Sequence, residues 1–136
     1  MTKITRIAIA AAAAGGALWT VKAAIITVRD AGFDPLEGVF FIGGLLAVVA
    51  AALLVPLALS QGRRPLARGA AVIAGVPLLV AATLAVEALG KTLAEELYAG
   101  GNLGIAQESG ILLCGLAWLA GAILLGSRRV RPRAAA

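Results

Sequence analysis

Three ionisable residues lie in or beside long apolar stretches of the chain: Lys22, Glu87 and Glu108. Lys22 interrupts the run WTVKAAIITV at residues 19–28. A lysine at the centre of a membrane helix costs about 2.5–3.5 kcal/mol on insertion scales, so it must reach the interface, find an acid or serve a function. Ionisable groups inside membranes hold ions, relay protons or bind substrates. We therefore treat Lys22, Glu87 and Glu108 as a candidate polar cluster.

Other catalytic chemistry has little support in the residue types. The chain has no histidine and one cysteine, Cys114, so an intrachain disulfide is excluded and a His/Cys metal site is disfavoured. Cys114 lies in an apolar helix, where a thiol behaves as a small hydrophobic group. No nucleophile has an evident activating partner. We expect neither an enzyme nor a bound cofactor.

The composition indicates an integral membrane protein. Of the 136 residues, 61% are hydrophobic and 14% are charged, whereas soluble domains average roughly 45–50% and about 25%. A single soluble core of this size could not hide so much apolar surface. The sequence predicts one all-α membrane domain over residues 1–136.

Four stretches are long enough to cross a hydrocarbon core of roughly 30 Å. Without Lys22 the first apolar run would be only about 15 residues, roughly 22 Å at 1.5 Å per residue, which is too short. Extended to Val28 it becomes long enough, so Lys22 lies inside the span. A cleaved signal peptide is the alternative for this run, because a basic start precedes an Ala-rich segment. The predicted spans are residues 5–28, 38–60, 69–89 and 105–126.

The basic residues orient this four-helix bundle. Arg29 and Lys91 fall in the two connections on the opposite side, together with most of the acids. By the positive-inside rule both termini are cytoplasmic. The residues that fall on the cytoplasmic side are Lys3, Arg6, Arg63, Arg64, Arg68, Arg128, Arg129, Arg131 and Arg133.

The charged connections also predict lipid contacts. The basic turn at residues 61–68 and the tail at 127–136 would meet anionic headgroups through Arg63, Arg64, Arg68, Arg128 and Arg129. Their short clusters lack interleaved aromatic residues, so nucleic acid is not an expected partner. In the connection between the third and fourth predicted spans, the second on the outer side, Leu93, Leu97 and Tyr98 recur at helical spacing before Gly100 and Gly101. This pattern predicts a short amphipathic helix on the outer membrane surface.

Small residues predict close helix packing. They recur every four residues at Ala11 and Gly15; at Gly43, Ala47 and Ala51; at Ala71 and Gly75; and at Ala117 and Gly121. Such faces let helix backbones approach closely in lipid. We read the pairs together as a tightly packed bundle, with no pair assigned to a particular interface.

The depth of the polar cluster leaves three interpretations open. Lys22 lies about six residues below the outer end of the first span and Glu87 about two below that of the third, a difference of roughly 6 Å. Lys22 could extend outward alone, form a structural ion pair with Glu87 or with Glu108 at a similar level, or belong to an ion or proton site.

Two functions fit these features. The first is a small multi-pass protein that acts by helix packing or binding, as an accessory subunit, a scaffold or a homo-oligomer. The second is a small oligomeric transporter or channel, with Lys22, Glu87 and Glu108 lining an outer vestibule. The Ala- and Arg-rich composition suggests a bacterial cytoplasmic membrane, with the lipid bilayer and a membrane protein or a second copy as partners.

Overall fold

A computed structural model describes residues 1–29, 35–97 and 103–127. These residues form four α-helices: α1 (Lys3–Arg29), α2 (Pro35–Leu59), α3 (Pro65–Leu97) and α4 (Leu103–Ser127). Each contains a stretch long and apolar enough to cross a membrane, at Lys3–Ile26, Pro35–Leu59, Pro65–Leu97 and Glu108–Ser127. The predicted class, an all-helical chain with four potential spans, is confirmed. Tyr98, Gly100, Gly101 and the arginines beyond Ser127 lie outside the described residues.

The predicted separate helix in the second outer loop is wrong, because α3 continues to Leu97. Leu93 lies in the last turns of this one helix. The helix passes through Gly90, where α3 meets α4 so closely that a Cβ would lie 2.8 Å from the Gly110 Cα. Lys, Leu, Ala and Glu, all good helix formers, follow Gly90.

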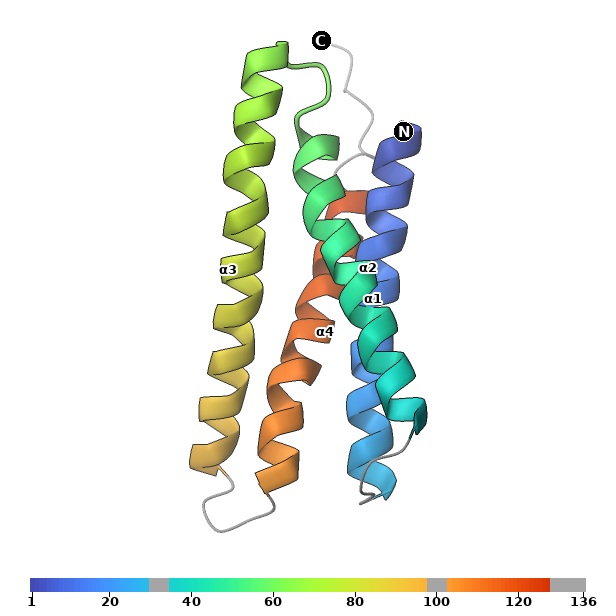
Figure 1. The fold of residues 1–136 in the computed structure, drawn as a ribbon, viewed down its shortest axis with the longest axis vertical. Helices are drawn as coiled ribbons and strands as arrows, with labels where there is room; N and C mark the ends of the chain where they lie inside the picture. The colour runs from blue at the N-terminus through green and yellow to red at the C-terminus, as the bar shows by residue number, and fades with distance from the viewer. Residues whose placement is uncertain (30–34, 98–102, 128–136) are drawn as a thin grey trace.

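A tight turn joins α2 to α3. Gly62 has a φ of 81°, a left-handed conformation that glycine adopts without steric cost. The Arg63 amide donates to the Ser60 carbonyl at 3.2 Å, and Pro65 begins α3 with a backbone angle suited to a first helical turn. The turn therefore sets α2 and α3 antiparallel (Figure 1).

The core lies among α1, α2 and α4. Two tryptophans, Trp19 and Trp118, are buried there among small residues and Val48. The remaining buried members of this core are Ala12, Ala51, Ala52, Cys114 and Ala122. In contrast, none of the most apolar segment of α3 is buried. Figure 1 shows α3 at the edge of the bundle, away from α1.

Glycines allow the close helix contacts. A Cβ on Gly16 would lie 2.6 Å from the Gly115 carbonyl oxygen, at the contact between α1 and α4. A Cβ on Gly15 would lie 2.7 Å from Val48 of α2. Among the predicted small residues, Gly15 and Gly75 make such contacts, whereas Gly121 has open space around it.

Candidate polar site within the bundle

The end of the molecule where α1 finishes and α2 and α4 begin carries the polar cluster. Lys22 lies seven residues before the end of α1, roughly 10 Å along the helix. Glu37 is in the first turn of α2, and Glu108 lies about five residues after the start of α4. Because the end of α1 and the starts of α2 and α4 lie at the same end of the bundle (Figure 1), residues far apart in the sequence come together.

Lys22 is held by two carboxylates. Its Nζ donates to both Oε1 and Oε2 of Glu108 at 2.8 Å and lies 3.3 Å from Oε1 of Glu37. The side chains of Lys22, Glu108 and Glu37 are 6%, 15% and 23% exposed. Lys22 therefore does not extend alone to water, and it ties α1 to both α2 and α4.

Two aromatic side chains adjoin the ion cluster. The Lys22 ammonium lies 5.4 Å from the centre of the Phe41 ring, within the range of a cation–π interaction. Phe41 in turn stacks on Trp19 at a centroid distance of 6.4 Å, and the Trp19 indole N–H donates to the Phe41 carbonyl at 3.3 Å. Gly44 leaves room for this indole, since any larger side chain there would overlap it.

The structure brings together two of the three predicted residues. Glu108 meets Lys22, whereas no ion pair joins Lys22 to Glu87 in the described part of the chain. Glu87 lies at the contact between α3 and α4, where its carbonyl oxygen and Cγ face Gly110. The depth of Glu87 and Glu108 along the predicted spans could not decide which of them pairs with Lys22. The partner of Lys22 is decided by which helices lie beside α1, and α1 packs on α2 and α4.

Sequence reasoning placed Glu37 in a connection and missed its role. The helix α2 begins at Pro35, three residues before the predicted span, and so takes Glu37 into its first turn. Proline at a first helical position followed by an acid is a helix-start signal that would have found it.

The arrangement has the chemistry of a buried ion cluster. Two carboxylates, from α2 and α4, lie within ion-pair distance of one ammonium from α1. Among the described residues, no group of three or more His, Cys, Asp or Glu side chains could hold a metal ion. Cys114 lies apart, where its Sγ donates to the Thr83 carbonyl at 3.2 Å.

No protein-family model, curated protein or solved structure matches the chain.

Proposed function

We propose that this is a non-catalytic membrane protein that acts as a homo-oligomer, joined through the outer face of α3. The observation that carries the proposal is a seam of small, exposed residues along α3. The seam is the set Ala70, Ala74, Pro77, Ala81, Ala85 and Ala88, and every member is exposed.

The seam points away from the rest of the bundle. Its residues recur at intervals of three or four and so share one face of the helix. The opposite face carries the residues that meet α2 and α4, among them Gly75, Leu79 and Gly90. The seam is therefore free of contacts that would explain its small residues within one copy.

Small residues on an outward face favour a protein neighbour over lipid. Lipid tails are as apolar as leucine, so apolarity alone does not drive helices together in a membrane. Close backbone approach does, and small side chains permit it. Larger exposed side chains, including Ile73 and Leu84, flank the seam and would enclose a second helix.

Charge at the end of α3 favours a second copy as that neighbour. The seven-residue spacing of Ala74, Ala81 and Ala88 continues to Glu95, and Lys91 lies four residues before Glu95. In a parallel pair of α3 helices, Lys91 of one copy is within reach of Glu95 of the other. Opposite charges thus complement each other across a symmetric interface.

A larger side chain within the seam tests the proposal. Ala81→Leu should weaken self-association about tenfold, because added side-chain volume at a close contact costs about 1–3 kcal/mol. Ala120→Leu, at an exposed alanine on α4, is the matched control and should associate like the wild type. Light scattering of the detergent-solubilised protein measures the oligomer. A wild-type monomer at all concentrations, or one bound only to a different protein, would contradict the proposal.

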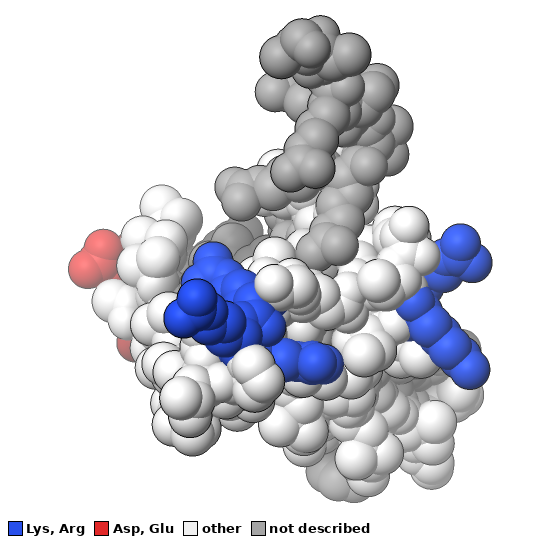
Figure 2. Space-filling view, turned by 90° about the horizontal axis from the view of Figure 1, so that it is seen from above, with Lys and Arg blue, Asp and Glu red and all other residues white. Residues whose placement is uncertain are grey.

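The proposed setting is the bacterial cytoplasmic membrane, crossed four times with both termini inside. The clustering of basic residues at one end supports it: Figure 2 looks onto the end where α1 begins and α2 turns into α3, and shows blue side chains there. Lys3, Arg6, Arg63, Arg64 and Arg68 belong to this end. Anionic headgroups would contact these arginines, together with Arg128 and Arg129 of the tail.

Transport is the second candidate function, and the buried cluster of Lys22, Glu37 and Glu108 favours it. An oligomer could align such clusters along a shared polar path. Under this alternative, Lys22→Ala or Glu108→Gln abolishes solute or proton flux in proteoliposomes while the protein remains folded. Normal flux in both variants would eliminate it.

A further inference from the structure

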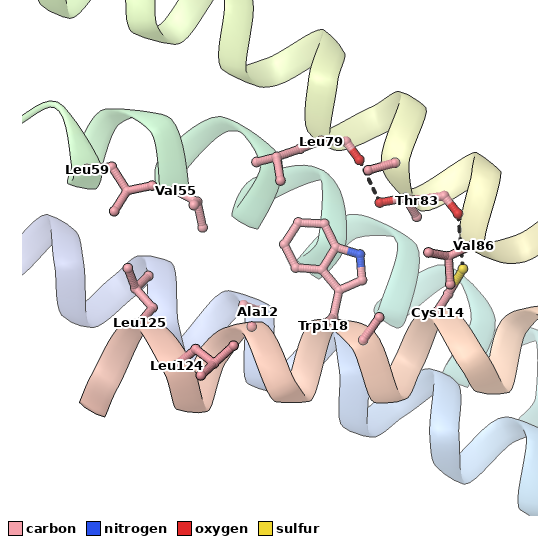
Figure 3. A pocket seen from close by; sticks show the side chains of 13 residues that line it. Ala12, Val55, Leu59, Leu79, Thr83, Val86, Cys114, Trp118, Leu124 and Leu125 are labelled. Atoms are coloured by element: carbon pink, nitrogen blue, oxygen red, sulfur yellow. Dashed lines mark hydrogen bonds between the residues drawn. The ribbon is translucent and has the colours of Figure 1, made fainter. Parts of the chain in front are cut away.

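An apolar crevice lies between α2, α3 and α4. It has a volume of about 300 Å³ and is lined by residues that include Val55, Leu79, Val86, Trp118 and Leu125. It exists because α3 touches its neighbours closely at two points, Gly75 on Pro56 and Gly90 on Gly110, and stands away from them in between. Figure 3 shows the Trp118 indole pointing from α4 into this space between α2 and α3.

The crevice adjoins a second cavity that ends in polar groups. This cavity, of about 260 Å³, shares Val55, Leu59 and Leu79 with the first. Its lining adds Ser60 and the guanidinium-bearing Arg63 at the turn between α2 and α3. An apolar slot therefore ends beside a positive charge, and Arg64 and Arg68 follow on the same turn and helix start.

The dimensions fit one hydrocarbon chain. The crevice alone is lined by α4 from Cys114 to Leu125, roughly 16 Å at 1.5 Å per residue. This exceeds half of a hydrocarbon core of roughly 30 Å, the depth that one leaflet occupies. Spread over this length, the volume of the crevice gives a cross-section of roughly 18 Å², far too narrow for a helix of roughly 10–12 Å diameter.

We propose that the crevice holds an anionic phospholipid, with one acyl chain against Trp118 and the phosphate at Arg63. The apolar lining supplies the surface for the chain, and the arginine supplies the charge that distinguishes an anionic headgroup from a neutral one. This site lies on the inner face of α3, so it is independent of the proposed seam. One arginine near a headgroup gives about a fivefold preference for the anionic lipid.

Trp118 provides a direct readout. Vesicles are prepared with phosphatidylglycerol or phosphatidylcholine carrying the same brominated acyl chains, which quench tryptophan fluorescence on contact. A Trp19→Phe background isolates Trp118, and the wild type repeats the comparison in case that background is unstable. We expect phosphatidylglycerol to quench at about fivefold lower mole fraction than phosphatidylcholine. Equal quenching by both lipids would overturn the proposal.

Two matched pairs of variants distinguish a lipid bound in the crevice from anionic lipid attracted to any basic residue at this end. Arg63→Gln should abolish the headgroup preference, whereas Arg6→Gln removes the same charge at the same end, outside the cavity, and should preserve it. Ala117→Leu narrows the crevice and should reduce quenching by both lipids at least twofold, while Ala120→Leu should not. Loss of the preference in both arginine variants, or unchanged quenching in Ala117→Leu, would overturn the proposal.

Discussion

Lys22 is buried between carboxylates from two other helices. A buried ion pair gains little over an apolar contact of the same volume, but removing one partner leaves an uncompensated charge. Here one ammonium serves carboxylates from two further helices, so its loss exposes two like charges to each other. The cluster specifies which ends of α1, α2 and α4 meet.

Removing the lysine alone should be costly. We expect Lys22→Met to lower the free energy of unfolding by about 3–5 kcal/mol, because Glu37 and Glu108 remain buried without a cation. Unfolding of the detergent-solubilised protein in sodium dodecyl sulfate, followed by circular dichroism, measures it. The triple variant Lys22→Met, Glu37→Gln, Glu108→Gln carries no unpaired charge and should recover most of the loss. A single variant as stable as the wild type would show that the cluster does not hold the helices.

Residue types alone indicated this site only in part. The apolar run around Lys22 required a span through the lysine, and charge placement put Glu108 near its depth. The choice between Glu87 and Glu108 depends on which helix packs beside α1. Hydropathy does not predict which helices are neighbours in the bundle. Phe41 and Trp19 behave in the sequence as ordinary apolar residues, and only packing places the Phe41 ring at the ammonium and Trp19 against that ring.

At the scale of the helix, glycine decides where the elements touch. The contact of α1 with α4 depends on Gly16 and Gly115 lying backbone to backbone. Spacing predicted that small residues would pack, because lipid offers no other strong driving force. It could not select the pairs, since alanine and glycine occur on every face of these helices.

A single methyl group tests the contact between α1 and α4. Gly16→Ala should destabilise the protein by about 1–3 kcal/mol, because the new Cβ would lie 2.6 Å from the Gly115 carbonyl oxygen. Gly69→Ala, in the second turn of α3, makes the same change in open space, where the higher helix propensity of alanine should leave stability unchanged or raise it by up to about 1 kcal/mol. The same detergent titration compares them. Equal effects of the two substitutions would refute the close contact.

At the scale of the whole molecule, charge is segregated along the bundle. Basic residues occupy the end with the turn between α2 and α3, and the cluster around Lys22 occupies the other. Hydropathy and charge predicted the four potential spans and this segregation, because both are properties of chain segments. The peripheral position of α3 was not predicted, since it depends on which pairs of small residues meet.

The proposed orientation has its own test. In a Cys114→Ala background, Gln61→Cys should react with a membrane-impermeant thiol reagent only after the cells are permeabilised, because it lies at the basic end. Glu96→Cys should react in intact cells. The reverse pattern would invert the proposed topology.

Cysteine cross-linking along α3 in native membranes tests the central claim, self-association through the seam, most directly. Single cysteines at residues 74, 81 and 88, in the Cys114→Ala background, should form disulfide-linked dimers on mild oxidation. Cysteines replacing Leu79 or Val86, which line the inner crevice, and Ala120 on α4 should remain monomeric. Monomers at all three seam positions, or dimers formed equally well at residue 120, would contradict the account.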